Sequence, residues 1–291
     1  MKTIAVIGKN GQLASELAQL KADNVEIMTF GRDDIDVFSV KILLDTFRLH
    51  QINAVINACA YTEVDLAETE PERAYLMNAQ AVENLAQACK QLSLHLVHVS
   101  TDYVFSGDKG RPYLPNDTIS PMGVYGKSKA EGEKYVKNIL DHKGCIIRTS
   151  WVYSVHGKNF VKTMINLMGV KSELGVVSDQ VGTPTSAKNL AQVCFLAAIN
   201  NVSGIHHYTD AGVASWYDFA VTIQSISYKY GLLDKEIVIN PINTEDYPAS
   251  AKRPFYSVLD KKSLYKALPD LIVMHWECAL NETIKSLAPS T

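Results

Sequence analysis

IAVIGKNGQLA, residues 4–14, joins a short apolar run to a glycine-spaced turn. The apolar residues predict a buried strand, and a helical pattern follows from Gln12. In this G-x-x-G-x-x-A spacing, Gly8 permits a tight turn, and Gly11 lets the backbone approach a pyrophosphate. Ala14 is small enough for the helix to pack close to the strand. An ordinary glycine-rich turn is the alternative, but the position between a first strand and a first helix favours dinucleotide binding.

Further apolar runs alternate with helical patterns through the first half of the chain. Strands that are apolar throughout and separated by helices predict a parallel sheet covered on both faces. The expected fold is therefore α/β, with a Rossmann-type doubly wound sheet. Strands are expected at residues 4–7, 25–30, 54–57, 94–99 and 145–149, and helices at 12–21, 40–50 and 71–92.

The alternation loosens after about residue 150. We expect an NAD(P)-binding domain at residues 1–150 and a smaller mixed α/β lobe at residues 151–291, which mainly binds substrate and crosses back to the first domain. Ligands of such folds bind at the carboxyl edge of the sheet. Helices are expected at residues 159–168, 186–200, 215–230 and 273–287, and short strands at 204–208, 236–239 and 257–259.

Composition excludes several classes of function. The 28 basic and 31 acidic residues of this 291-residue chain give a net charge of −3, which argues against nucleic acid or an anionic membrane as the main partner. The apolar run at residues 4–7 is too short for a signal peptide, and no run reaches the roughly 20 residues of a membrane span, so a cytoplasmic protein is expected. The five cysteines form no CxxC pair, which disfavours a zinc site and a disulfide framework.

Two motifs in the middle of the chain predict carbonyl chemistry. Ser100-Thr101-Asp102 ends the fourth strand, and Tyr125 and Lys129 lie on one face of a later helix. A free tyrosine has a pKa of about 10, and a nearby lysine cation is expected to lower it. Tyr125 can then pass a proton to a carbonyl oxygen, while Thr101 polarises that oxygen. Lys129 can also hold ribose hydroxyls.

The second strand ends without the acidic residue that would bind a ribose 2′-hydroxyl. Arg32 follows it instead, and a guanidinium group suits a 2′-phosphate, so NADPH is expected and NADH remains possible. A solvated Arg32, or one lying flat on the adenine, is the alternative. The small residues of segment 57–62 let the backbone approach the nicotinamide-side ribose, unless that segment is only a strand end.

Phrases along nearly the whole chain resemble the dTDP-4-dehydrorhamnose reductase family, in the extended branch of the short-chain dehydrogenase/reductase superfamily. They are GKNGQL (8–13), NACAYTEVDLAE (57–68), STDYVFSG (100–107), PMGVYGKSKAEGE (121–133), RTSWVYS (148–154), NFVKTM (159–164), SDQVGTPT (178–185) and SAKRP (250–254). The later phrases discriminate best, because the glycine loop and the Tyr/Lys pair are shared across the superfamily.

The resemblance implies reduction of the C4 ketone of dTDP-4-dehydro-6-deoxy-L-mannose by NAD(P)H. It implies that Tyr125 donates the proton with the support of Lys129, and that Thr101, Asp102 and Trp151 contact the substrate. It also implies a set of cofactor-binding positions, namely Gly11, Gln12, Leu13, Asp36, Val37, Ala60, Tyr61, Thr62 and Val99.

Three later residues are expected near the substrate, each with a structural alternative. Trp151 follows a strand and could pack on a base or sugar, or simply in the core. Gln180 lies in a turn-rich loop whose hydrogen-bonding groups could face the substrate, or the loop is only structural. Arg253 offers a cation to a diphosphate, or is a solvated surface residue. Some relatives form Mg²⁺-bridged dimers, but the sequence shows no metal cluster, so Mg²⁺ stays unassigned and the chain could be a monomer or a homodimer.

Two other functions fit the same motifs. Another nucleotide-sugar reductase, epimerase or dehydratase of this branch is one, although a dehydratase would need a Glu beside Asp102, where Tyr103 stands. A non-catalytic NADP-binding regulatory subunit is the other. Thr101, Tyr125 and Lys129 are all present, which argues against a lost active site.

Overall fold

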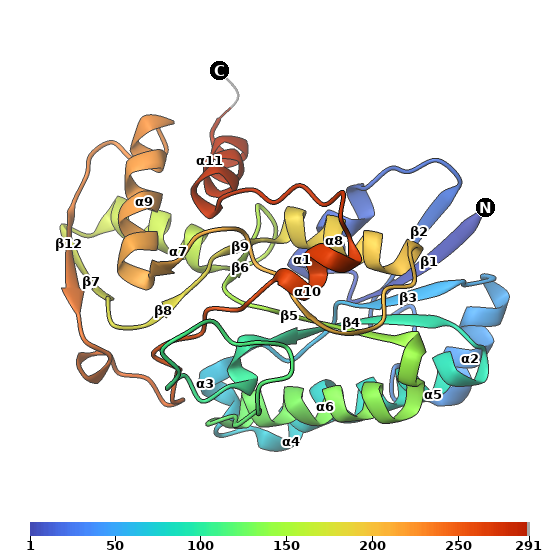
Figure 1. The fold of residues 1–291 in the computed structure, drawn as a ribbon. Helices are drawn as coiled ribbons and strands as arrows, with labels where there is room; N and C mark the ends of the chain where they lie inside the picture. Colours follow the sequence, from blue (N-terminus) through green and yellow to red (C-terminus); the bar gives the residue numbers. More distant parts are fainter. Residues whose placement is uncertain (290–291) are drawn as a thin grey trace.

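The computed structural model of the protein describes residues 1–289. A six-stranded sheet crosses its larger lobe in the order β10-β5-β4-β3-β1-β2, and every pairing within it is parallel (Figure 1). The chain runs from β1 to β2 in one direction and then from β3 to β5 in the other. The crevice for a ligand is therefore expected at the carboxyl ends of β1 and β3. The strands are β1 (Lys2–Ile7), β2 (Val25–Phe30), β3 (Ala54–Asn57), β4 (His95–Thr101), β5 (Gly144–Thr149) and β10 (Gly204–His207).

Helices cover both faces of this sheet (Figure 1). One face packs on α2 (Val40–Leu49), α5 (Ala81–Gln91) and α6 (Val124–Leu140). The other face packs on α1 (Gln12–Gln19), α8 (Ala187–Ile199) and α10 (Lys262–Ala267). Alternate residues of each strand enter the two cores, as expected for a sheet buried on both sides. The doubly wound α/β fold expected from the sequence is confirmed.

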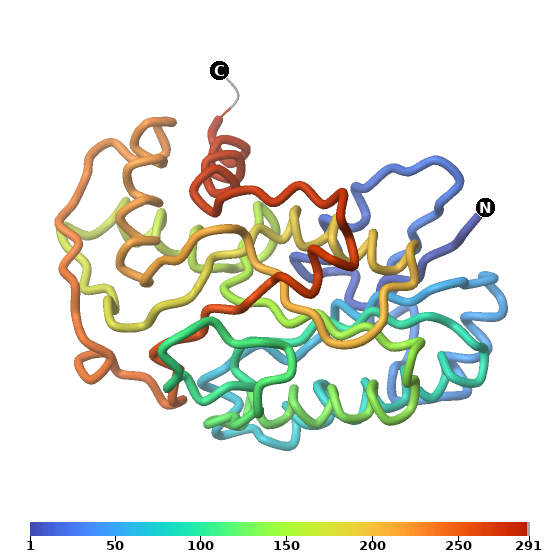
Figure 2. The backbone as a smooth tube through the Cα atoms, in the orientation of Figure 1, coloured from blue at the N-terminus to red at the C-terminus, as the bar shows by residue number. Residues whose placement is uncertain are grey.

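A smaller lobe is built around an aromatic core that includes Tyr153, Phe219 and Trp276. Its strands form three separate pairs, and one of its three helices, α9, begins at a capping box made by Ser215 and Asp218. Figure 2 traces the chain as it returns from this lobe to the sheet at α10 and leaves again for the last helix. The elements are α7 (Phe160–Val170), α9 (Trp216–Lys229), α11 (Trp276–Leu287), β6 (Val152–Tyr153) with β9 (Thr185–Ser186), β7 (Glu173–Val177) with β12 (Val238–Ile242), and β8 (Val181–Gly182) with β11 (Ala214–Ser215).

Several expected elements differ in their bounds. The helix expected at residues 71–92 consists of α4 (Pro71–Tyr75), a π-helical turn at Leu76–Gln80 and then α5. The strand expected at 236–239 begins only at Val238, because its pairing with β7 starts there. At 257–259 the backbone forms isolated bonds to Val181 and to Tyr113 rather than a strand. The last helix begins at Trp276 rather than Val273. The short helix α3 (Val64–Ala67), β7 and α10 were not expected.

Glycines set how closely α6 packs on its neighbours. A Cβ on Gly126 would collide with the carbonyl oxygen of Tyr103, and a Cβ on Gly132 would collide with the carbonyl oxygen of Asn78 in the π-helical turn. Both contacts are with backbone atoms, which cannot move aside as a flexible side chain can. The helix that carries Tyr125 is therefore held close to the strand end and to the π-helical turn.

Within residues 1–289, the structure contains no helix that is both long enough and apolar enough to span a bilayer.

We predict that Gly132→Ala lowers the free energy of unfolding by about 1–3 kcal/mol, since the added methyl group forces α6 away from the π-helical turn. Gly169 in α7 is the matched control, because a Cβ there meets open space. Gly169→Ala should leave stability unchanged or raise it by up to about 1 kcal/mol, as alanine favours a helix. Urea unfolding of both variants checks this, and equal behaviour would contradict the packing constraint.

Candidate active site

The amino end of α1 forms the first part of the site. Gly8 has φ +116°, in the region that favours glycine, and a Cβ there would lie 2.9 Å from the backbone nitrogen of Cys59. Gly11 is the N-cap of α1, and among the described residues no side chain caps this helix end. The first N–H groups of a helix have no partner within it, so this end can receive phosphate oxygens. The side chain of Leu13 is buried in the core, which leaves only its backbone for such a contact.

Cations surround the end of β2. Arg32 is exposed there, and Lys9 of the glycine loop pairs with Asp34 at 3.2 Å. The Asp34 carboxylate also accepts a bond from the N–H of Gly31, and this bond together with Lys9 keeps the pKa of Asp34 below its ordinary value. Lys9 was missed in the sequence analysis, although it lies inside the glycine motif. Asp36 is exposed and accepts from the N–H of Phe38.

A buried asparagine joins the loop after β3 to α6. Asn78, in the π-helical turn, accepts from the N–H of Tyr61 at 2.9 Å and donates to the carbonyl of Tyr61 at 3.1 Å. Its amide also donates to the hydroxyl of Ser128 at 3.0 Å. Asn78 thus fixes segment 60–62 relative to the helix of Tyr125 and Lys129. Sequence periodicity did not indicate this role of Asn78, because in the sequence it is one polar residue within a long predicted helix.

Thr101, Tyr125 and Lys129 meet at the carboxyl end of β4. Lys129 is 2% exposed, and its ammonium group donates to the carbonyl of Val99 at 2.6 Å. The Thr101 hydroxyl donates to Asp102 at 3.0 Å and lies beside the phenol of Tyr125. The ring of Tyr103 meets that of Tyr125 edge to face, with centroids 5.7 Å apart. The structure brings the three proposed catalytic residues together.

Burial dominates the ionisation of these groups. It raises the pKa of Tyr125 to about 12, with the Asp102 carboxylate acting in the same direction and the Thr101 hydroxyl against it. Burial also lowers the pKa of Lys129 to about 8, although Cys59 and Glu133 oppose this shift. The expectation that Lys129 lowers the pKa of Tyr125 is therefore wrong, because desolvation of the phenolate dominates and Lys129 is not among the groups that shift this pKa. A protonated phenol remains well suited to donate a proton.

Asp102 is 2% exposed, and its Oδ2 atom lacks a hydrogen-bond partner within the part of the chain that the structure describes. Burial raises the pKa of this carboxyl to about 6, while the nearby hydroxyls of Ser257 and Thr101 oppose the shift. A buried polar atom without a partner is unusual in a native protein. Asp102 therefore offers a hydrogen-bonding group to a ligand beside Thr101.

An ion pair lies beneath these residues. Glu133 of α6 and Arg148 of β5 are 5% and 3% exposed, and their Oε2 and Nη2 atoms are 2.6 Å apart. Ser100 donates to the Glu133 carboxylate at 2.5 Å, and Arg148 donates to the carbonyl of Pro115 at 3.0 Å. The sequence analysis missed this pair, whose partners stand in two motifs singled out for other residues.

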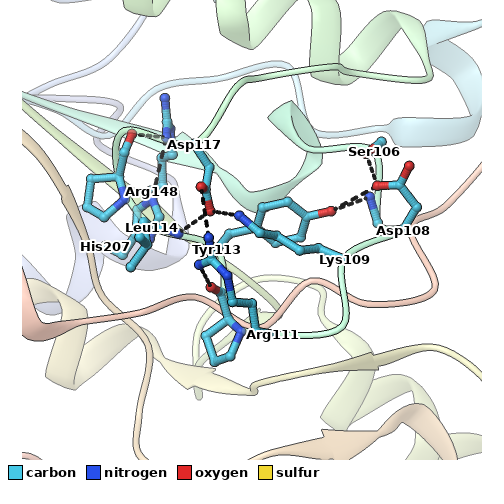
Figure 3. A network of polar contacts seen from close by, with 12 residues as sticks. Ser106, Asp108, Lys109, Arg111, Tyr113, Leu114, Asp117, Arg148 and His207 are labelled. Atoms are coloured by element: carbon cyan, nitrogen blue, oxygen red, sulfur yellow. Dashed lines mark hydrogen bonds and ion pairs between the residues drawn. The ribbon is translucent and has the colours of Figure 1, made fainter.

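The loop after β4 is tied down by its own polar network (Figure 3). Asp117 pairs with Lys109 and Arg111 and accepts from the N–H of Leu114 at 2.7 Å. At the other end of the loop, Ser106 donates to Asp108. Arg148 of β5 donates to the carbonyl of Pro115 in the same loop, so the loop that follows Thr101 is fixed to the central sheet.

The residues expected on the substrate side are more dispersed. Trp151 has φ +49°, rare for a bulky residue, and its ring stacks on Trp216 with centroids 3.7 Å apart. Gln180 is 4% exposed and donates to the hydroxyl of Thr244 at 3.1 Å. Arg253 pairs with Asp65 at 2.6 Å rather than being a solvated cation. Each of the three side chains thus already has a protein partner.

Across residues 1–289, no group of three or more His, Cys, Asp or Glu side chains is arranged to hold a metal ion. Mg²⁺ therefore stays unassigned.

Residues 1–288 match the protein family described as RmlD substrate binding domain. A dTDP-4-dehydrorhamnose reductase of Aggregatibacter actinomycetemcomitans is 39% identical over 275 residues, which cover 92% of this chain and 93% of that protein. The crystal structure of a Clostridium acetobutylicum dTDP-4-dehydrorhamnose reductase has a TM-score of 0.90 at 40% identity, covering 98% and 99% of the two chains. A Bacillus anthracis dTDP-4-dehydrorhamnose reductase in complex with NADP has a TM-score of 0.90 at 33% identity, covering 98% and 100%.

The raised pKa of Asp102 predicts a pH dependence of stability. Between its ordinary value of 3.8 and its value of about 6 in the protein, the folded state binds more protons than the unfolded state. The free energy of unfolding contributed by this group is present at low pH and is lost as the pH rises through about 6. Relative to Asp102→Asn, the wild type should therefore lose about 2–3 kcal/mol between about pH 4 and about pH 7.

Urea unfolding at several pH values checks this. Asp33→Asn at an exposed position is the control and should follow the wild type throughout. A constant difference between the wild type and Asp102→Asn would show that Asp102 titrates as a solvated carboxyl.

Proposed function

The chain belongs to the family described as RmlD substrate binding domain, and we infer from this membership and from its site that it is a dTDP-4-dehydrorhamnose reductase. The reaction is reduction of the C4 ketone of dTDP-4-dehydro-6-deoxy-L-mannose to dTDP-L-rhamnose by NAD(P)H. The single observation that carries the carbonyl chemistry is the meeting of Thr101, Tyr125 and Lys129 at the carboxyl end of β4. The nucleotide-sugar substrate is inferred from the family match over residues 1–288 and from the named relatives.

The cofactor is proposed to be NADPH. The free N–H groups at the start of α1 suit its pyrophosphate, and exposed Arg32 with neighbouring Lys9 suits its 2′-phosphate. NADPH supplies a hydride to the carbonyl carbon of the substrate. The remaining contacts are proposed for the segments that follow β1, β2 and β3 and for strand β4, at Gly8, Gly11, Gln12, Leu13, Asp36, Val37, Ala60, Tyr61, Thr62 and Val99.

The proposed roles of the catalytic residues follow from their ionisation. Tyr125, with its raised pKa, is protonated at neutral pH and donates its proton to the C4 oxygen. Thr101, whose hydroxyl donates to Asp102 in this structure, is proposed to turn that hydroxyl to the same oxygen and to stabilise the charge that develops on it. Lys129, with a pKa of about 8, is mainly a cation at pH 7, so it can bind ribose hydroxyls and stabilise the phenolate that is left.

On the substrate side, Asp102 is proposed to bind a sugar hydroxyl through its Oδ2 atom, which has no partner among the described residues. Trp151 is proposed to pack against the nucleotide sugar with the ring face or edge that Trp216 leaves free, and Arg253 to face the diphosphate. Gln180 already donates to Thr244, so its proposed contact must use the carbonyl oxygen or the second amide hydrogen.

The direct test offers the purified protein dTDP-4-dehydro-6-deoxy-L-mannose with NADPH or with NADH. Loss of the absorbance of the reduced nicotinamide, with dTDP-L-rhamnose as the product, is the expected result. Firm cofactor binding without turnover would instead favour a regulatory subunit. Turnover of a different ketosugar in its place would favour another reductase of the same branch.

We predict that Tyr125→Phe lowers kcat by about 10²–10⁴, because the proton donor is lost. NADPH affinity should stay nearly intact, since the ring and Lys129 remain. Stopped-flow turnover and a fluorescence titration with NADPH measure the two quantities. Near-normal turnover in this variant would overturn the assignment of the acid.

Arg32→Ala should weaken NADPH binding more than NADH binding, because only NADPH carries the 2′-phosphate. The expected selective loss is about tenfold, the size of one exposed charge-assisted contact. Titration with each cofactor checks it. An equal loss for both cofactors would show that Arg32 contacts the adenine or nothing specific.

A further inference from the structure

Two carboxylates of one short segment join parts of the site that are far apart in the sequence. The acidic segment, Asp65–Glu68, begins within α3 and directly follows the loop of residues 60–62. Asp65 contacts the loop that contains Arg253, and Glu68 contacts the first residue of α6. Neither carboxylate was assigned a role above.

Asp65 organises the loop of residues 250–253. Its Oδ1 accepts from the backbone N–H groups of Ser250 at 3.1 Å and Ala251 at 3.0 Å. The guanidinium of Arg253 adds two bonds, 3.2 Å to Oδ1 and 2.6 Å to Oδ2, in the two-point geometry that fixes an arginine most firmly. Partial burial raises the pKa of Asp65, but these bonds outweigh it and hold the pKa below the ordinary value.

Glu68 caps the helix that carries Tyr125. The N-cap residue of α6 is Gly123, which has no side chain to close the helix end. The Oε1 atom of Glu68 accepts from the N–H of Val124 at 2.8 Å. A cap fixes the first turn of a helix, and a carboxylate there also interacts favourably with the positive end of the helix dipole. Tyr125 is the next residue, so Glu68 fixes the turn from which its phenol extends.

Arg253, which Asp65 binds, and Tyr125, which follows the residue that Glu68 binds, both lie close to Tyr103. The charge of Arg253 lies close enough to lower the pKa of Tyr103, although burial raises that pKa more strongly. The ring of Tyr103 in turn meets the ring of Tyr125 edge to face, at 5.7 Å. Asp65 and Glu68 are three residues apart, so a single turn of chain sets the positions of Arg253 and Tyr125 on either side of Tyr103.

We propose that Asp65 and Glu68 are positioning residues, Asp65 for Arg253 at the substrate diphosphate and Glu68 for Tyr125 at the substrate carbonyl. The proposal rests on the proposed function, which gives Arg253 and Tyr125 those roles. The side chain of Asp65 is 44% exposed, so its ion pair contributes little to global stability. The effect of removing Asp65 should therefore appear in kinetic constants rather than in unfolding. Removing Glu68 also removes a helix cap, which lowers stability, so kcat of that variant is measured under conditions in which it stays folded.

The test compares kcat, KM and the urea midpoint of full-length variants. Asp65→Ala should raise KM for the nucleotide sugar about tenfold with little change in kcat. Glu68→Ala should lower kcat about tenfold with little change in KM, because a small displacement of the acid is costly. Glu68→Gln keeps an oxygen that can accept from Val124, so it should restore most of the lost kcat. Glu72→Ala, in the next helix, is the matched control and should behave as the wild type.

Two further measurements separate this proposal from the proposed function. In an Arg253→Ala background, Asp65→Ala should change KM no further, since Asp65 acts through Arg253. Calorimetric titration with dTDP-L-rhamnose should show weaker binding to Asp65→Ala and unchanged binding to Glu68→Ala.

Unchanged kcat and KM in both alanine variants would overturn the positioning roles while leaving the reductase intact. So would a parallel fall of kcat and urea midpoint that Glu68→Gln does not reverse. If the wild type binds dTDP-L-rhamnose but does not reduce the ketosugar, the reductase function fails, and the titration still decides the role of Asp65. A wild type that neither binds nor reduces overturns both.

Discussion

The buried ion pair between Glu133 and Arg148 is the interaction on which the geometry of the site depends. Charges withdrawn from water are costly unless every polar atom finds a partner, and here Ser100 and the Pro115 carbonyl complete the set. These partners come from α6, β5, the end of β4 and the loop behind it. We infer that the pair does more to specify the packing of these four elements than to stabilise it. Lys129 lies one helical turn before Glu133, so the same packing places the lysine that is proposed to take part in catalysis.

Close backbone contact adds a second constraint on α6. Gly132 lets the helix touch the π-helical turn, and that turn directs Asn78 toward both Tyr61 and Ser128. An uninterrupted α-helix would turn Asn78 to another angle, because a π-helical turn accommodates one more residue. The irregular turn therefore belongs to the site, since it fixes the loop proposed to bind the cofactor against the helix proposed to carry the acid.

Sequence reasoning succeeded where the signal is local. The glycine spacing after β1, the apolar strands and capping residues such as Ser215 depend on neighbours in the chain, and the structure places these elements within a few residues of expectation. Sequence reasoning failed where contacts between distant segments determine the local structure or the partner of a side chain. The π-helical turn depends on contact with α6, and the partner of Arg253 is 188 residues away in the sequence. Nothing near Arg253 distinguishes a cation free for a diphosphate from one already paired with Asp65.

The electrostatics of Tyr125 show the same limit in the chemistry. A lysine four residues along a helix suggests a lowered pKa, because sequence reveals the charge but not the burial. Burial instead moves Tyr125, Lys129 and Asp102 toward their neutral forms, with pKa values of about 12, 8 and 6. Because these groups are buried from solvent, a hydrogen bond to a developing oxyanion is stronger here than in water. A phenol that holds its proton until a carbonyl oxygen gains charge is suited to reduction, because the proton is then transferred only as that charge forms.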